Sequence, residues 1–211
     1  MGTVPRAEMG TVPGNDPVMA ALARAAGPFT LKPERRRSPY EALVSAIAHQ
    51  QLTGAAAATI LSRFRALYPH GHLPAPAELL DTPDESLRAA GFSRAKAAAL
   101  RDLAARTLDG TVPPRAKLAR LPDEEIIERL TEVRGVGRWT VEMFLIFTLG
   151  RPDVLPVDDY GVRNGFRIAY RKRELPAPKR LAAFGERWAP HRSTAAWYLW
   201  RAVDLHRAGT L

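Results

Sequence analysis

The sequence predicts an all-α fold, and two observations lead to that prediction. Apolar residues recur at helical spacing in successive segments from Tyr40 onward. The alternation of apolar and polar residues that is typical of strands is absent except over Asp153–Val157, which is too short to found a sheet. Many short helices joined by short loops favour a two-lobed bundle over a long coiled coil.

Capping residues and helix breakers mark the expected helices in chain order. The first covers Val18–Ala26 after Pro17. The next begins at Tyr40, with Ser38 as N-cap and Pro39 at the first helical position. Further helices are expected at Gly54–Tyr68, Pro76–Leu80, Asp84–Ala90, Ser93–Thr107, Asp123–Val133, Trp139–Leu149, Val162–Tyr170, Lys179–Trp188 and Ser193–Ala208. Ser93 is expected to cap the helix that it begins.

The chain is expected to consist of a leader and one helical domain. Residues 1–16, in which the pentapeptide at Met1 recurs at Met9, are predicted to be a flexible leader because they are rich in Gly and Pro. Residues 17–211 form the helical domain. Its lobes are expected at about 38–115 and 116–211, with the N-terminal helix packed on the second lobe.

Composition narrows the classes of function. The 211 residues include 31 Lys and Arg against 22 Asp and Glu, a formal net charge of +9, which favours anionic partners and above all nucleic acid. General solubility is the alternative explanation of this charge. The absence of Cys excludes disulfides, thiolate zinc sites and cysteine-ligated iron–sulfur clusters. No N-terminal apolar run resembles a signal peptide or a membrane span, so we expect a cytoplasmic protein, nucleoid-associated if bacterial.

A Gly-Val-Gly turn at residues 135–137 joins two expected helices. Glycine allows positive φ and close approach of the main chain to a ligand, and free N–H groups of the following helix can hold a phosphate. A simple inter-helix turn is the commoner explanation of a lone Gly-x-Gly. Arg134 and Arg138 beside the turn, and the acidic pair Asp158 and Asp159 further on, strengthen the phosphate interpretation.

With the turn before it, the motif Pro156-Val157-Asp158-Asp159-Tyr160 resembles the helix-hairpin-helix DNA glycosylases, specifically the 3-methyladenine DNA glycosylase II group, over about residues 38–208. The resemblance implies a two-lobed helical glycosylase fold in which the hairpin is followed by a Gly/Pro-rich loop and a catalytic aspartate. It implies a monofunctional enzyme of base excision repair that flips out damaged, alkylated bases and hydrolyses the N-glycosidic bond. The implied partner is double-stranded DNA containing damaged bases, with no membrane and no obligate protein partner.

The resemblance also assigns the catalytic carboxylate. Matching the Asp-Asp-Tyr run selects Asp159, whereas matching Pro-x-Asp alone selects Asp158. A fixed anion stabilises the positive charge that develops on the sugar and can orient or deprotonate the attacking water. Because both aspartates precede an expected helix, N-capping is the alternative role.

The residues expected to contact the base come from the same resemblance. Relatives that cut the strand through a Schiff base have a lysine just after Arg138, where this chain has Trp139, so hydrolysis by water is favoured. Trp200 matches the family's pocket tryptophan, and an alkylated purine with a positive charge is attracted to aromatic faces. Core packing is the alternative for Trp139. The substrate-binding residues are Trp139, Tyr160, Trp200 and Met143, which stands where some relatives have a tyrosine.

The expected DNA contacts lie at two turns. Gln51 is near the position where some relatives insert a leucine into the duplex, although an ordinary polar turn is nearly as good an explanation. No metal or organic cofactor is implied, although the family's hairpin can hold a monovalent cation. The alternatives are a non-catalytic DNA-binding module and an enzyme that cuts the strand with a lysine elsewhere. The hairpin residues expected to bind DNA are Arg134, Gly135, Gly137, Arg138 and Thr140.

Overall fold

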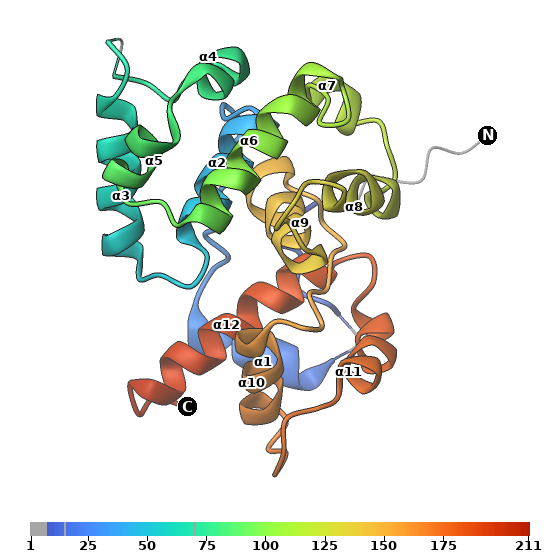
Figure 1. Ribbon diagram of the computed structural model, residues 1–211. Coiled ribbons are helices and arrows are strands. Elements are labelled where there is room, and N and C mark those ends of the chain that lie inside the picture. The colour runs from blue at the N-terminus through green and yellow to red at the C-terminus, as the bar shows by residue number, and fades with distance from the viewer. Residues whose placement is uncertain (1–7, 15, 70) are drawn as a thin grey trace, which may run out of the picture. The chain divides into compact units, whose positions relative to one another are not determined.

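A computed structural model describes residues 8–14, 16–69 and 71–211. Within these ranges all regular structure is helical and no strand occurs, so the predicted all-α fold is confirmed (Figure 1). The segment Asp153–Val157, which alone showed any alternation, is a loop. None of the helices in the described ranges is long and apolar enough to cross a membrane.

The chain divides into two compact units. Unit 1 combines Met1–Glu34 with Leu145–Leu211, and unit 2 is Arg35–Phe144. The division therefore differs from the lobe boundary expected near residue 115. The reason is packing, because the helices between residues 115 and 144 lie against each other and against earlier helices of unit 2.

Unit 2 consists of short helices: α2 (Pro39–His49), α3 (Gly54–Ala66), α4 (Pro76–Asp81), α5 (Asp84–Ala90), α6 (Arg94–Leu108), α7 (Arg115–Leu118), α8 (Asp123–Thr131) and α9 (Arg138–Phe144). The predicted N-caps Ser38 and Ser93 are confirmed, and Ser38 forms a reciprocal capping box with Glu41. The sequence missed α7, whose single turn is too short to show helical periodicity. Helix α6 packs on α2 and α4 and forms the centre of the unit.

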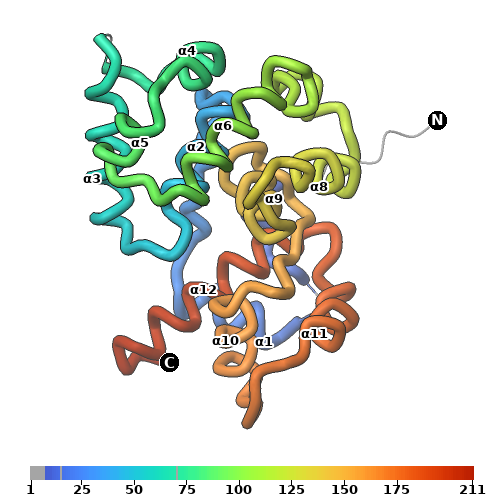
Figure 2. Tube along the Cα trace, viewed as in Figure 1, coloured from blue at the N-terminus to red at the C-terminus, as the bar shows by residue number. Residues whose placement is uncertain are grey.

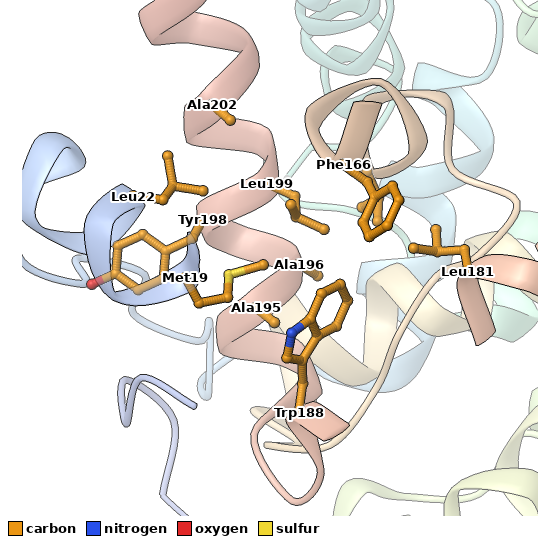
Figure 3. Packing of buried hydrophobic residues seen from close by; sticks show 11 residues of the cluster. Met19, Leu22, Phe166, Leu181, Trp188, Ala195, Ala196, Tyr198, Leu199 and Ala202 are labelled. Carbon is orange, nitrogen blue, oxygen red and sulfur yellow. The ribbon is translucent and has the colours of Figure 1, made fainter. Parts of the chain in front are cut away.

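Unit 1 is built around its last helix and brings the two ends of the described chain together. Its elements are α1 (Pro17–Ala26), the π-helix η1 (Leu145–Leu149), α10 (Tyr160–Ala169), α11 (Pro178–Gly185), the 3-10 helix η2 (Glu186–Trp188) and α12 (Arg192–Arg207). Helix α12 packs against both α10 and α1, and these three are the red, orange and blue helices labelled in Figure 2. Met19 and Leu22 of α1 join Trp188 and Leu199 in one buried cluster (Figure 3).

The segment before α1 is packed where the structure describes it. The Gly10 amide donates to the Thr194 hydroxyl over 2.9 Å, and Pro13 is buried. Asp16 is 3% exposed and caps α1, accepting hydrogen bonds from the Tyr170 hydroxyl and from the Trp188 indole N–H. These residues depart from the expected flexible leader because Tyr170, Trp188 and Thr194 supply partners for its polar groups. The first pentapeptide copy, from Met1, lies outside the described residues.

Candidate functional site

Asp159 is held at the start of α10 by two donors. Its Oδ1 accepts the Val162 amide over 2.7 Å, which makes it the N-cap of the helix. The same oxygen accepts the Trp200 indole Nε1–H over 2.8 Å. The expected alternative, helix capping, is thus a real role of Asp159, but capping does not require the bond from α12. Its neighbour Asp158 is exposed, whereas Asp159 is half-buried.

The bond between Asp159 and Trp200 depends on an unusually close approach of α10 to α12. A Cβ on Gly161 would lie 2.8 Å from the Trp200 Cδ1 and 3.0 Å from the Asp159 Oδ1. A Cβ on Gly165 would lie only 1.9 Å from the backbone oxygen of Leu199. The two glycines are one turn apart on the face of α10 that meets α12. Their missing side chains therefore allow Trp200 to reach the carboxylate.

The loop before Asp159 is anchored to the first residues of α12. The Arg192 guanidinium binds both carboxylate oxygens of Asp153, at 2.8 Å and 2.9 Å. The Ser193 hydroxyl donates to the Arg151 carbonyl over 2.7 Å and accepts the Val154 amide over 2.9 Å. These contacts give a physical role to the adjacent residues Arg192 and Ser193. They fix the path of the loop that carries Asp159.

Phe147 is an aromatic neighbour of Trp200 that the sequence analysis missed. It belongs to the π-helix η1, is 41% exposed, and stacks on Trp200 with ring centroids 5.5 Å apart. Both rings line a cavity of about 640 Å³, together with Trp197 and Asp204. Helical periodicity could not have found it, because a π-helix changes the angular position of each residue relative to a regular α-helix. π-Helical turns occur frequently at functional sites.

The predicted hairpin in unit 2 has the expected glycine geometry at one of its two positions. Gly135 has a φ of 75°, which side chains disfavour, and is exposed. Gly137 does not have positive φ, and a Cβ there would meet nothing within 4 Å. No neighbour within the described chain therefore requires a glycine at 137. The close approach of a ligand to the backbone stays a prediction for this position.

The other hairpin residues that are predicted to bind DNA differ in their exposure and in the partners that they already have. Arg134 is exposed, and its backbone amide donates to Asp102 over 2.7 Å. The Arg138 guanidinium already binds Glu124 at 2.6 Å and 2.9 Å and Glu142 at 3.1 Å. The hydrogen bonds that Arg138 donates to Glu124 raise the pKa of Arg138 and lower the pKa of Glu124. Thr140 is 6% exposed, and its contact with DNA stays a prediction.

The turn between α2 and α3 carries Gln51 in a strained backbone conformation. Gln50 has φ −54° and ψ 127°, Gln51 has φ 58°, and the Leu52 amide donates to the His49 carbonyl over 3.2 Å. This is the pattern of a type II turn, in which glycine is preferred at the position of Gln51. A side chain there costs roughly 1–2 kcal/mol. The strain points to a use for the exposed Gln51 side chain.

A comparison with known families identifies the class of protein. Residues 44–191 match the model of the HhH-GPD superfamily of base excision DNA repair proteins. The chain belongs to this superfamily. The matched range includes the hairpin, the π-helix and the Asp159 loop. The family predicted from the sequence is thereby confirmed.

Individual HhH-GPD relatives agree with this assignment. The chain is 44% identical to DNA-3-methyladenine glycosylase 1 of Schizosaccharomyces pombe over 170 residues, 81% of this chain and 75% of that protein. It is 34% identical to the alkylbase DNA glycosidase-like protein mag2 of the same yeast over 90% of both chains. A solved S. pombe 3-methyladenine DNA glycosylase in complex with abasic DNA is 40% identical, covers 92% of this chain and 95% of its own, and has a TM-score of 0.84. The two-lobed helical glycosylase fold is therefore shown.

The remaining predicted base-contacting residues of this HhH-GPD protein belong to different units. Tyr160 follows Asp159 in unit 1 and is 64% exposed. Trp139, 45% exposed, and the half-buried Met143 both lie on α9 in unit 2. Contact of these three residues with a base stays a prediction. Asp159, Trp200 and the newly found Phe147 are brought together within unit 1.

Proposed function

We propose that this protein is a monofunctional DNA glycosylase that removes alkylated bases from double-stranded DNA by hydrolysing the N-glycosidic bond, with Asp159 as its catalytic carboxylate. Its relatives are named as 3-methyladenine DNA glycosylases over most of its length, and one is solved with DNA. They support an enzyme of base excision repair rather than a non-catalytic DNA-binding module.

The reaction requires a fixed anion beside the sugar. As the bond from C1′ to the base nitrogen breaks, positive charge develops on the sugar, and water adds to C1′ while its proton leaves. A carboxylate held in place stabilises that charge without reorganising and can accept the water's proton. The two donors on the Asp159 Oδ1 supply this fixed position. The bond from Trp200 is the observation that favours Asp159 over Asp158.

The aromatic neighbours of Asp159 suit an alkylated base. The faces of Trp200 and Phe147 attract flat rings, and more strongly those with a formal positive charge. Methylation of a purine ring nitrogen creates such a charge and weakens the glycosidic bond, so both effects favour the damaged base. Trp139, Met143 and Tyr160 are proposed as further contacts to the extruded base.

DNA binding completes the proposal. The excess of Lys and Arg and the exposed hairpin at Arg134 and Gly135 favour contacts to the phosphate backbone. Extrusion of a base costs a few kcal/mol, least for a damaged or poorly paired base, which contributes to selectivity. A repair enzyme works in a compartment that contains DNA, and the expected location in the cytoplasm, at the nucleoid in a bacterium, is part of this proposal.

The decisive experiment measures release of free bases from methylated duplex DNA by the intact protein, Asp159→Asn and Asp158→Asn. Asparagine retains an oxygen that can accept from Val162 and Trp200, so Asp159→Asn removes the charge and preserves the fold. We expect release to fall about a hundredfold or more while DNA affinity is retained. Asp158→Asn makes the same charge change on an exposed neighbour and serves as the control.

The same assay can reject each part of the proposal. Loss of release in Asp158→Asn alone moves the catalytic assignment by one residue. Absence of release by the intact protein from methylated, deaminated and etheno substrates contradicts the enzyme itself. Borohydride trapping of a covalent adduct with DNA would show a Schiff base and contradict hydrolysis by water alone.

A further inference from the structure

Lys96 occupies a position that the stability of its own helix does not explain. It lies in the first turn of α6, three residues after the N-cap Ser93. A cation is unfavourable there because the N-terminus of a helix carries partial positive charge. Its ammonium instead reaches another helix, donating to the Ala48 carbonyl over 2.9 Å and to the Gln50 carbonyl over 2.8 Å.

These two carbonyls belong to the end of α2 and to the turn that follows. The last carbonyls of a helix have no partners within it, and a lysine ammonium can supply them. Such charge-assisted bonds are stronger than those between neutral groups. Burial lowers the pKa of Lys96, which is consistent with an ammonium held against the protein rather than in solvent. Lys96 therefore acts as a C-cap of α2 from outside the helix.

The same turn is tied to the hairpin by a second polar contact. The Gln50 side-chain Nε2 donates to the Gly135 carbonyl over 2.9 Å. Gln50 thus gives its backbone oxygen to Lys96 and its side chain to the hairpin. All these residues belong to unit 2. The two exposed turns proposed to contact DNA are consequently joined by hydrogen bonds through one residue.

We propose that Lys96 is a positioning residue for base extrusion. Its ammonium holds the Gln50–Gln51 turn, in which Gln51 has positive φ, in a fixed position relative to the hairpin at Gly135. The Gln51 side chain then enters the duplex while the hairpin holds the backbone beside it. This inference rests on the proposed glycosylase function, because it needs a base to be extruded.

The proposal predicts a dependence on pairing that a general loss of stability does not. Without Lys96 the turn loses its fixed position, so opening a paired site becomes harder. A base that is already unpaired needs little help to leave the stack. Loss of Lys96 should therefore slow excision at a paired site much more than at an unpaired one. Cleavage of the glycosidic bond itself, which Asp159 assists, should be unaffected.

The test uses Lys96→Met in the full chain, with Arg94→Met as the matched control. Arg94 is an exposed cation in the same helical turn, so both variants lose one positive charge from the same region. Single-turnover excision is measured for one lesion placed in a fully paired site and in a single-base bulge. We expect Lys96→Met to slow the paired site roughly 10- to 100-fold and the bulge by much less. Lys96→Arg, which can still donate to carbonyls, should recover part of the loss.

Other outcomes overturn the proposal. Equal slowing at both sites, no slowing, or the same pattern in Arg94→Met contradicts a positioning role. Thermal unfolding shows whether Lys96→Met is folded, and if it is not, Gln50→Leu decides the question, since it removes the donor to Gly135 and should give the same dependence on pairing. If the intact protein excises neither substrate, the glycosylase function fails first and the positioning role fails with it.

Discussion

The two units hold their proposed functional residues by different means. In unit 1, the carboxylate of Asp159 meets Trp200 because two helix backbones lie in direct contact at glycines. In unit 2, the side chains of Lys96 and Gln50 hold exposed turns by donating hydrogen bonds to their backbone carbonyls. The site in unit 1 should therefore be disrupted by a larger side chain at a glycine. The turns in unit 2 should be disrupted by the loss of a hydrogen-bond donor. The following experiments test this contrast.

The largest effect is expected from Gly165→Ala in unit 1. The new methyl group would overlap the Leu199 carbonyl, whose backbone cannot rotate away, so α10 must shift from α12. We expect the free energy of unfolding to fall by about 3 kcal/mol or more, measured by urea denaturation. The control is Gly137→Ala in unit 2, where a Cβ meets nothing within 4 Å. Equal losses in the two variants would contradict the distinction between the units.

The next effect concerns Asp16, the buried anchor of α1. Burial raises the pKa of its carboxyl, but hydrogen bonds from Tyr170, Trp188, Met19 and Val18 outweigh it and leave the pKa below 3.8. Because the folded-state pKa is depressed, the stabilisation is present above the unfolded-state value and disappears as the pH falls through the folded-state value. Asp16→Asn should lose about 2 kcal/mol at neutral pH. The difference from the intact protein should shrink below about pH 4, and a constant difference from pH 7 to pH 3 would refute this account.

Trp200→Phe tests the contribution of the indole N–H separately from that of the aromatic ring. The variant keeps a ring beside Phe147 but removes the donor to the Asp159 Oδ1. Base release should fall roughly tenfold, the effect of about 1.4 kcal/mol, because one of the two donors that fix the carboxylate is lost. The unfolding midpoint should change little. Unchanged release would show that the carboxylate is fixed without the indole N–H.

Arg134→Gln and Arg138→Gln test which hairpin cation meets DNA. Arg134 is exposed, whereas Arg138 is bound to Glu124 and Glu142. The binding constant for duplex DNA is measured at several salt concentrations. The slope of its logarithm against the logarithm of the salt concentration should be about one unit less steep for Arg134→Gln than for the intact protein. Arg138→Gln should mainly lower stability, because the buried carboxylate of Glu142 loses its ion pair with the Arg138 guanidinium. A larger salt effect for Arg138 would mean that its ion pairs open when DNA binds.

The smallest effect is expected from Gln51→Gly. Glycine relieves the positive φ of this turn, so the free energy of unfolding should rise by about 0.5 kcal/mol. Excision of a paired lesion should nevertheless slow, since no side chain remains to enter the duplex. A gain in stability with unchanged excision would show that Gln51 is an ordinary turn residue. Gln51→Asn is the matched variant, since it tolerates the same φ and keeps a shorter amide.

Local features predicted most of the helices because their signals lie within one turn of the chain. Ser38 and Ser93 cap the helices that they were expected to cap, and Asp84–Ala90 has the predicted bounds. The single turn of α7 was missed because it shows no helical periodicity over enough residues. The helix expected over Trp139–Leu149 is present, but its periodicity did not indicate that the last turn, around Phe147, is a π-helix. The packed segment around Asp16 was missed for another reason, because its partners are more than a hundred residues away.

The sequence by itself determined the helical class, the family resemblance and the candidate carboxylate, because spacing, caps and the Asp-Asp-Tyr run are local patterns. Only the tertiary structure decided which groups meet. It joined Asp159 to Trp200, stacked Phe147 on that indole, and brought the Lys96 ammonium to the Gln50 carbonyl, next to Gln51. The physical reason is that each of these contacts joins residues that are far apart in the sequence and belong to different elements. Such contacts depend on how closely backbones pack, at Gly165 above all, and spacing along a single chain does not encode that distance.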